Sequence, residues 1–444
     1  MDVESQNMNN TQPAPAQGSL PQSMRFAVGS KRAASARLSL LNLQPYNGNS
    51  FSADSNNEIR LNIQSSGFMD VAKHSLRMTV SVVTTTATAN IDYSLASLFD
   101  QVRLESQGTV LERLDRYALI DNVKSMYNDS MAELKNKSCT SLGPDFTSTE
   151  IVSAGADFGG TTSGSVTGSL RIRSGLLQSK HGHALPMGSA PIELVLRMNP
   201  KAGCVLGKST SGTDITSVTI SNVAFLCPMY QIESEAIMAQ YRQVLQSSPL
   251  TICGETYKTY VGSLVASGTN QVLQINDRSR SLKALCSVIR TNAAATTYKF
   301  PSNSEFLVTN VNRYTYNIAG SQMPPGGVKL STTVGTLELG EAMDQAQKAL
   351  CPYNQIRGSG LIGVGKFKAA SSNTGTGGKG VLCVDLKKFS DSERCFVGID
   401  TASNAQPMTV EFECASSVSA SDVTTFAICE AEWVLAQGRW GVSV

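Results

Sequence analysis

An internal repeat constrains the fold of this chain more than any other feature of its sequence. Residues 102–112 (VRLESQGTVLE) recur as residues 328–338 (VKLSTTVGTLE), and each copy runs into a helix-like stretch, at 114–126 and 341–350. Chance similarity of short strand-like segments is the alternative for this match taken alone. Together with a second match, it predicts one domain used twice, with Val102 lying over Val328.

The second match keeps the same order along the chain and nearly the same spacing. Residues 191–196 (PIELVL) correspond to residues 407–412 (PMTVEF), and a loop and a long apolar stretch follow each copy. We therefore expect Pro191 to lie over Pro407 in the two copies of the domain. Surface loops absorb the small difference in spacing between the two matches.

Hydrophobic residues alternate with polar ones over much of the chain, which is the period of half-buried strands. The alternation begins near residue 57 and continues to the C-terminus, and its first members are Ile59, Leu61, Ile63, Leu76, Met78, Val80 and Val82. Loops rich in Gly, Ser and Thr separate several of these segments, and strands do not alternate with helices. The pattern predicts an all-β protein and not one built from βαβ units.

One segment breaks this alternation. Ile237, Tyr241 and Leu245 recur with a helical period, Ser234 is placed to cap a helix, and Pro249 lies beyond its end. We expect a short helix that packs between two domains, and not one that docks a foreign partner. The resulting domain division is an N-terminal arm at 1–49, a first domain at 50–230, a linker helix at 231–250 and a second domain at 251–444.

Length and charge agree with this division and exclude some classes of function. A chain of 444 residues accommodates two all-β domains of roughly 200 residues each. Its formal net charge of +2 excludes a folded body that acts as a basic cradle for nucleic acid. The ten cysteines include no CxxC pair and lie largely in apolar runs, so we expect them to be reduced. No signal peptide or transmembrane helix is expected, which favours synthesis in a cytosol-like compartment.

The N-terminal segment has the composition of an arm. It is rich in Asn, Gln, Ser, Pro and Ala, and it carries a small basic cluster of Arg25, Lys31, Arg32 and Arg37. Such a cluster can contact phosphate groups of a genome or an inner layer during assembly. A solvated tail whose charges only aid solubility is the alternative.

Four further segments resemble a known family. They are residues 220–230 (ISNVAFLCPMY), 273–290 (LQINDRSRSLKALCSVIR), 382–389 (LCVDLKKF) and 397–401 (VGIDT). With them, roughly residues 50–444 resemble the double jelly-roll major capsid proteins of the adenovirus, polinton-like virus, virophage and large DNA virus lineage. The long tower insertions of the larger members of that lineage are missing here.

This resemblance implies a fold and a function. The fold is two tandem eight-stranded jelly rolls with a short interdomain helix and a few loop helices. The function is that of a structural subunit that forms homotrimeric, pseudo-hexameric capsomers of an icosahedral shell. The implied partners are other copies of the chain, neighbouring capsomers, and penton and minor capsid proteins, and the implied location is the virion, assembled inside a host cell.

Two glycine-rich motifs are poor candidates for a cofactor site. Residues 358–363 spell GxGxxG but lead into a strand-like run, whereas a dinucleotide site requires a helix there. Residues 203–209 resemble a phosphate-binding loop but have three residues between the glycines, where four are required. We expect no cofactor.

Metal and catalytic sites are also poorly supported. His181 and His183 could share a metal, but His74 is the only other histidine, so a loop pair without a metal is favoured. A triad such as Cys204, His183 and Asp214 has no local signature. We therefore expect a protein that is not an enzyme, with no catalytic, cofactor or metal residues.

Other binding proteins remain as alternatives to the capsid role. A carbohydrate-binding or tail-fibre β-sandwich predicts clustered exposed aromatic residues, but only 6% of the residues are aromatic. The two tryptophans, Trp433 and Trp440, both lie in the last strand-like segment. A single jelly roll with a projection domain would lack the internal repeat.

Overall fold

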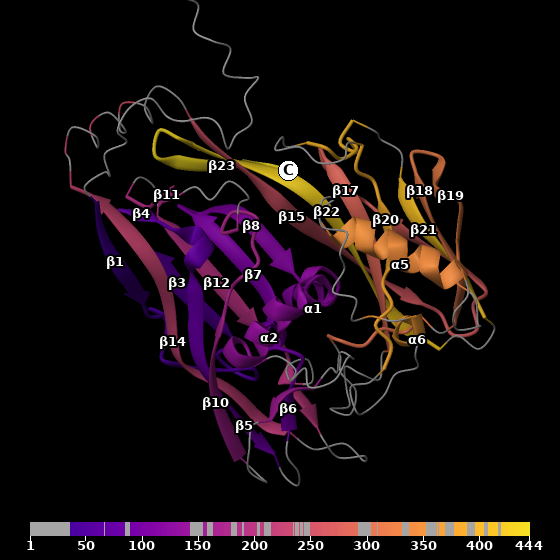
Figure 1. Ribbon diagram of the computed structural model, residues 1–444, viewed down its shortest axis with the longest axis horizontal. Helices are drawn as coiled ribbons and strands as arrows, with labels where there is room; N and C mark the ends of the chain where they lie inside the picture. The colour runs from indigo at the N-terminus through magenta and orange to yellow at the C-terminus, as the bar shows by residue number, and fades with distance from the viewer. Residues whose placement is uncertain are drawn as a thin grey trace, which may run out of the picture.

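The computed structural model describes residues 36–65, 67–84, 89–142, 154–157, 163–178, 184–188, 191–201, 205–207, 215–233, 235, 239, 243, 249–291, 303–308, 310–330, 337–351, 362, 364–368, 377–388, 396–403, 407–415 and 419–444. Strands dominate this part of the chain and gather in two bodies that lie side by side (Figure 1). We call the body built from β1 to β14 the first sandwich and the body built from β15 to β23 the second sandwich. None of the helices in the described ranges is long and apolar enough to span a bilayer.

The first sandwich has two main sheets. The larger one has the order β10-β5-β14-β4-β11, with β1 and β2 also paired to β14. Its strands are β1 (Ala36–Leu43), β2 (Ser50–Ser52), β4 (Phe68–Met69), β5 (Ser75–Thr84), β10 (Ser163–Leu170), β11 (Leu185–Pro186) and β14 (Ile215–Ile232). The other sheet has the order β3-β12-β7-β8 and consists of β3 (Glu58–Ile63), β7 (Phe99–Ser106), β8 (Thr109–Asp115) and β12 (Ile192–Met198). A small sheet is formed by β6 (Ala89–Asp92), β9 (Ala154–Asp157) and β13 (Val205–Gly207).

The second sandwich repeats this plan. One sheet has the order β15-β22-β17-β20, with β23 paired to β22, and the other has the order β16-β21-β18-β19. The first sheet contains β15 (Leu250–Leu264), β17 (Leu282–Thr291), β20 (Leu382–Asp385), β22 (Ser421–Ala436) and β23 (Arg439–Ser443). The second contains β16 (Asn270–Ile275), β18 (Val311–Ile318), β19 (Ser321–Lys329) and β21 (Met408–Cys414).

The two sandwiches correspond strand by strand. If β1 and β2 are taken together, the order β1/β2-β14-β5-β10 matches β15-β22-β17-β20, and β3-β12-β7-β8 matches β16-β21-β18-β19. Matching strands also follow one another in the same order along the chain. Each sandwich therefore contains eight corresponding strands in two packed sheets, and the expected all-β fold of two tandem eight-stranded units is confirmed.

One of the two sequence matches is right and the other is wrong. Pro191 and Pro407 immediately precede the corresponding strands β12 and β21, as expected. Val102, however, lies in β7, whereas Val328 lies in β19, which corresponds to β8. The sequence match pairs β7 with β19, whereas the structural counterpart of β7 is β18. The two strands of each hairpin have similar alternation of polar and apolar residues, so sequence alone does not distinguish them.

The hairpin turns give the correct alignment of the repeat. Gln107 and Gly108 connect β7 to β8 with φ values of 50° and 81°, and Ala319 and Gly320 connect β18 to β19 with φ values of 51° and 80°. Two successive positive φ values are typical of the tight turn whose twist matches that of an antiparallel hairpin. Gly320, and not Gly335, therefore corresponds to Gly108.

Helices follow these hairpins, as the sequence predicted. The helices described over their whole length are α1 (Tyr117–Asn128), α2 (Met131–Thr140), α5 (Leu337–Leu350) and α6 (Val364–Phe367), with short 3-10 turns η3 (Val71–Lys73) and η4 (Leu95–Leu98). α1 follows β8, and α5 is the next helix after β19. α2 begins at a capping box, in which the Ser130 hydroxyl accepts from the Glu133 amide and the Glu133 carboxylate accepts from the Ser130 amide.

The sandwich cores follow the period of the strands. Ile59, Leu61 and Ile63 in β3 are fully buried, and Leu76, Met78, Val80 and Val82 in β5 are buried too. The intervening side chains of these strands are more exposed. The expectation that these residues form one face of each strand is confirmed.

Two expectations need correction. The segment 36–43, placed in the N-terminal arm, is the strand β1, and all eight of its residues pair with β14. Backbone pairing of that length makes it part of the sheet. Cys286 and Cys383 form a disulfide, so the expectation that all ten cysteines are reduced is wrong for this pair. They lie directly opposite each other on the neighbouring strands β17 and β20.

The expected linker helix falls mostly outside the described residues. Glu235, Ala239 and Gln243 are helical and exposed, and their four-residue spacing places them on one face of a helix. The apolar positions Ile237, Tyr241 and Leu245 are not among the described residues.

Candidate functional site: the seam between the two sandwiches

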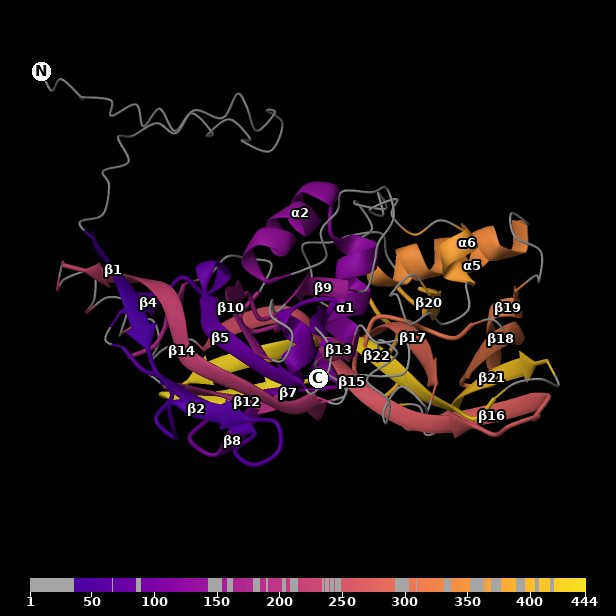
Figure 2. The ribbon, with the colours of Figure 1, turned by 90° about the horizontal axis from the view of Figure 1, so that it is seen from below.

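The helix α1 and the strand β8 of the first sandwich meet β15 and β22 of the second sandwich along a surface that we call the seam (Figures 1 and 2). Three α1 side chains cross it. The Asn122 amide donates to the Asn303 carbonyl oxygen at 3.2 Å, and the Tyr127 hydroxyl donates to the Lys379 carbonyl oxygen at 2.8 Å. The Lys124 ammonium pairs with Glu255 at 2.8 Å.

Two glycines allow the backbones to approach closely at the seam. A Cβ on Gly175 would lie 2.6 Å from the Glu255 carbonyl oxygen, and a Cβ on Gly254 would lie 2.9 Å from Cζ3 of Trp433. The Trp433 indole is fully buried and donates from Nε1 to the Leu111 carbonyl oxygen in β8 at 2.9 Å. The second sandwich is thus anchored to the first by an aromatic ring whose polar atom has a partner.

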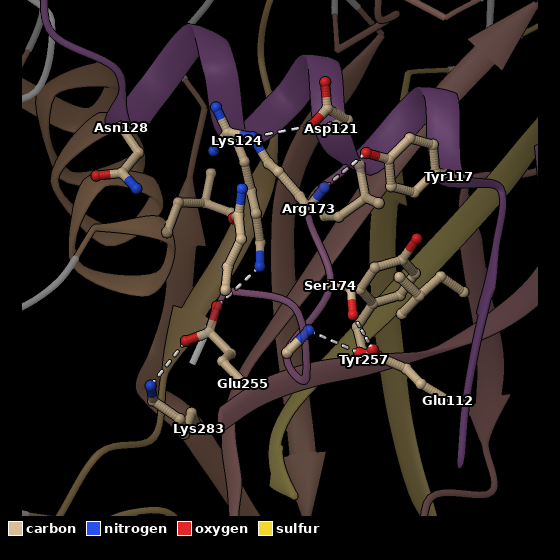
Figure 3. Close-up of a pocket in the computed structure, with 15 residues that line it drawn as sticks. Glu112, Tyr117, Asp121, Lys124, Asn128, Arg173, Ser174, Glu255, Tyr257 and Lys283 are labelled. Atoms are coloured by element: carbon tan, nitrogen blue, oxygen red, sulfur yellow. Dashed lines mark hydrogen bonds and ion pairs between the residues drawn. The ribbon is translucent and has the colours of Figure 1, made fainter. Parts of the chain in front are cut away.

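A cavity of about 240 Å³ lies beside this contact and is lined by charged and aromatic side chains from both sandwiches (Figure 3). Glu255 extends into it from β15 and accepts from Lys124 at 2.8 Å and from Lys283 at 2.7 Å. Burial opposes ionisation of this carboxyl group, but the two ammonium groups outweigh burial and hold the pKa of Glu255 well below its usual range. Glu255 is therefore a carboxylate that joins α1 to β17 through β15.

A second charged group lies on the first-sandwich side of the cavity. The Arg173 guanidinium contacts Asp121 at 2.8 Å and donates to both carboxylate oxygens of Asp129 at 2.6 Å. Lys137 pairs with the same Asp129 at 2.6 Å. Because Asp121 lies on α1 and Lys137 on α2, these contacts tie the two helices to the loop that carries Arg173 and Gly175.

Glu112 is buried at the base of the cavity. It accepts from the Ser174 hydroxyl and, at 2.9 Å, from the Gly175 amide, as Figure 3 shows. Burial raises the pKa of Glu112, and these donors only partly offset that effect. The carboxyl group holds the loop at Gly175 in the position that the close approach to Gly254 requires.

Another buried network joins the small sheet of the first sandwich to the second sandwich. Asp92, at the end of β6, accepts from the Asn303 amide at 2.9 Å and from the Ser304 hydroxyl at 2.5 Å. The Lys379 ammonium donates to the Ser304 carbonyl oxygen at 2.7 Å. Burial raises the pKa of Asp92 to about 6 and lowers the pKa of Lys379 to about 8.

The arrangement of the seam suits a mechanical role. Its carboxylates face cations or backbone amides, and its aromatic ring packs against glycine, so the contacts fix the two sandwiches relative to each other. Within the described residues, no group of three His, Cys, Asp or Glu side chains could hold a metal ion.

Comparison with known proteins is informative at the level of structure. No protein-family model matches the chain, and no curated protein matches it in sequence. Similar solved structures include the PBCV-1 virus capsid (TM-score 0.58, 11% identity, covering 94% of this chain and 99% of that chain). The Faustovirus major capsid protein gives a TM-score of 0.57 at 9% identity, covering 92% and 93% of the two chains. The mavirus major capsid protein gives 0.52 at 11% identity, covering 100% and 96%.

The chain has the double jelly-roll fold. Each sandwich is one jelly roll, and the coverage of these structures extends over both. The fold expected from the resemblance of residues 220–230, 273–290, 382–389 and 397–401 is therefore confirmed.

The structure describes one of the four residues of the predicted basic cluster. Arg37 lies in β1 and is exposed, while Arg25, Lys31 and Arg32 are outside the described residues. Their role in assembly stays a prediction.

The residues weighed for metal binding or catalysis lie mostly outside the described part of the chain. His181, His183, Cys204 and Asp214 lie outside the described residues, as does most of the GxGxxG motif. The run after that motif, expected to be strand-like, is instead the short helix α6. His74 is buried, donates from Nδ1 to the Val71 carbonyl oxygen at 2.5 Å and accepts at Nε2 from the Ile172 amide at 2.9 Å. Burial, helped by Arg171, lowers its pKa to about 4, so it is a neutral structural residue.

Sequence reasoning missed the seam residues of the double jelly roll. Gly175, Gly254 and Glu255 carry no local signal, because their roles arise only where the two jelly rolls meet. Both tryptophans are buried, Trp433 fully and Trp440 with 6% exposure, which agrees with the argument against an aromatic binding surface.

Proposed function

We propose that this chain is the major capsid protein of a virus, a structural subunit that forms an icosahedral shell and performs no catalysis. Three copies would form a pseudo-hexameric capsomer, because each copy presents two similar jelly rolls and a closed ring of three presents six. The observation that carries this proposal is the strand-by-strand correspondence of two jelly rolls fixed by a seam. The solved structures that share the fold are named as viral capsid or major capsid proteins.

The proposal includes partners and a location. The chain would associate with itself, with neighbouring capsomers and with penton and minor capsid proteins, within the virion and after synthesis in the host cell. We propose a first jelly roll that begins with β1 and ends at Ile232, a linker, and a second jelly roll from Leu250, in place of the expected bounds 50–230, 231–250 and 251–444. Two facts support it: β14 ends at Ile232 and β15 begins at Leu250, and no described strand of one jelly roll pairs with the other.

The basic cluster is proposed as an assembly element. Arg25, Lys31 and Arg32 would contact the genome or an inner layer through phosphate charge, with an affinity that falls as salt rises. Arg37 lies on β1 of the sheet and is better placed for a protein contact.

Measurement of the oligomeric state tests the capsid proposal. Light scattering after size exclusion should give about three times the 47.2 kDa of the chain, with and without reductant. Reductant should not matter because the described disulfide lies within one sheet of the second sandwich. A monomer at micromolar concentration would contradict the proposal.

A carbohydrate-binding or tail-fibre role remains the second candidate. It predicts clustered exposed aromatic rings, but both tryptophans are buried, and the exposed rings Tyr46 and Phe396 lie on different sandwiches. A glycan array with the purified chain would separate the two functions, and we expect no binding.

A further inference from the structure

We propose that Cys286 and Cys383 form a redox-controlled lock on the strand β20, open as two thiols in reducing surroundings and closed as a disulfide in oxidising ones. Closing this lock would fasten β20 to β17 and so stabilise the second sandwich. The inference concerns one sandwich within one copy of the chain, so it holds or fails independently of the proposed capsid function.

The strand β20 has a short ladder compared with its counterpart in the first sandwich. It is the last strand of its sheet and pairs with β17 through four residues, whereas the corresponding strand β10 pairs with β5 through eight. Neither β5 nor β10 contains a cysteine. The duplicated fold therefore holds the same strand by a long ladder in one sandwich, and by a short ladder with a covalent bond in the other.

Several parts of the second sandwich meet at β20. From β18, in the opposite sheet, the Tyr316 hydroxyl donates to the Leu382 carbonyl oxygen at 2.7 Å. The Tyr314 hydroxyl of the same strand donates to the Cys383 carbonyl oxygen at 3.0 Å. The helix α5 packs against β20 as well (Figure 1). Release of β20 would therefore loosen contacts with the opposite sheet and with a helix.

The disulfide closes a long loop of the chain. Its two cysteines are 97 positions apart, and the chain between them includes β18, β19, α5 and α6. A cross-link restricts the unfolded chain more strongly as the loop that it closes becomes longer. We therefore expect the closed lock to raise the melting temperature clearly above that of the reduced protein.

Closing the lock requires an oxidant, which a small-molecule disulfide such as oxidised glutathione can supply. The thiolate of one cysteine attacks the small disulfide, forms a mixed disulfide and releases one small thiol. The thiolate of the other cysteine then attacks the protein sulfur of the mixed disulfide, and the second small thiol leaves. Two protein thiols are oxidised in this sequence, one small disulfide is reduced, and the two protons pass to the released thiols.

Burial of the two sulfur atoms makes this exchange depend on β20. Cys286 and Cys383 are both fully buried. A small thiol or disulfide can reach them only when β20 separates from β17, and a ladder of four pairs allows that separation as a local event. The rate of exchange should therefore follow the opening of β20, and not the unfolding of the whole chain.

Melting experiments under oxidising and reducing conditions test the lock. The full chain should melt about 10 °C higher after treatment with oxidised glutathione than in the presence of a phosphine reductant. The Cys286→Ala/Cys383→Ala variant should melt at one temperature under both conditions. The matched control is Cys227→Ala, which removes a buried thiol outside the disulfide and should keep the full shift.

Hydrogen exchange shows where the lock acts. Reduction should speed the exchange of the β20 amides, and of the β17 amides opposite them, by at least about tenfold. The corresponding strands β10 and β5 of the first sandwich should exchange at unchanged rates, so they serve as a control within the same molecule. This measurement uses the parent protein, so it does not depend on whether a variant folds.

Three results would overturn the proposal. The first is that Cys286 and Cys383 are still alkylated as thiols, by mass spectrometry, after treatment with oxidised glutathione. The second is that the fully reduced protein melts at the same temperature as the oxidised protein. The third is that reduction speeds exchange equally in both sandwiches, because the bond would then stabilise the whole chain and not β20.

Discussion

Gly175 and Gly254 face each other across the seam, and the ring of Trp433 covers both. A methyl group on either residue would enter space occupied by backbone or by the indole. The two backbones can approach this closely only because both residues lack a side chain.

Gly175→Ala and Gly254→Ala should each lower the free energy of unfolding by about 1–3 kcal/mol, the usual cost of overpacking a filled contact. The control is Gly340→Ala in α5, where a Cβ would have no neighbour within 4 Å. Because alanine favours helix over glycine by about 1 kcal/mol, this control should be neutral or stabilising. Urea unfolding monitored by Trp fluorescence measures all three. Equal effects of the three substitutions would mean that the seam is loosely packed.

Glu255→Gln should destabilise the protein by about 1–3 kcal/mol, because it leaves Lys124 and Lys283 without their shared anion. The side chain of Glu255 is 30% exposed, so the loss should fall short of that for a fully buried ion pair. A double-mutant cycle with Lys124→Met should show coupling, with the double variant less destabilised than the sum. The exposed pair Asp344 and Lys348 supplies the control, and Asp344→Asn should cost less than about 1 kcal/mol.

His74 should make the protein sensitive to acid. Its pKa in the folded protein is about 4, below the ordinary 6.5, so its contribution to stability is complete above pH 6.5. That contribution should be lost as the pH falls from 6.5 to 4, by about 3 kcal/mol in total. The His74→Phe variant, which can still stack on Phe225, should lack this slope.

Asp92 should raise the free energy of unfolding as the pH falls, which is opposite to the effect of His74, over part of this pH range. Its folded pKa of about 6 lies above the ordinary 3.8, so its contribution is complete below pH 3.8 and is lost as the pH rises through 6. Stability of His74→Phe should therefore increase as the pH falls from 6 to 4. Unfolding free energies at half-unit pH intervals distinguish the two groups, and an unchanged acid slope in His74→Phe would show that other groups control it.

Truncation should separate the arm from the sheet. Deleting residues 1–35 should leave the melting temperature nearly unchanged, since a segment of such composition buries too little surface to offset its ordering entropy. Deleting residues 1–43 should lower the melting temperature, because it also removes the eight-residue pairing of β1 with β14. Differential scanning fluorimetry compares the two, and a large loss in the shorter deletion would place part of 1–35 in the fold.

The sequence was a good guide to strands and a poor guide to their exact correspondence. Ile59, Leu61 and Ile63 alternate because one face of β3 is buried, and this is visible without a structure. The match of Val102 with Val328 failed because alternation is the same in both strands of a hairpin. The equivalent turn in the second sandwich begins at Ala319, which has a positive φ. Sequence patterns for such turns rely on asparagine or glycine at this position, so an alanine gives no signal.

The candidate site was harder to predict than the fold for a physical reason. Gly175 is required by a backbone that approaches from residue 254, and Lys124 acquires a role only from Glu255. Such pairs join residues that are far apart in sequence, so no local pattern reports them. The positions of the basic cluster can be read directly from the sequence. The sequence does not tell which groups these charges contact.

The strand β19 forms one edge of its sheet and contains Pro324 and Pro325. Neither proline has an N–H group, so this edge cannot donate a regular ladder of hydrogen bonds to an added strand. Proteins stored at high local concentration are at risk of polymerising through their sheet edges into fibrils. By blocking that route at β19, the two prolines would leave contacts between side chains as the mode of association open to this edge when the protein is crowded.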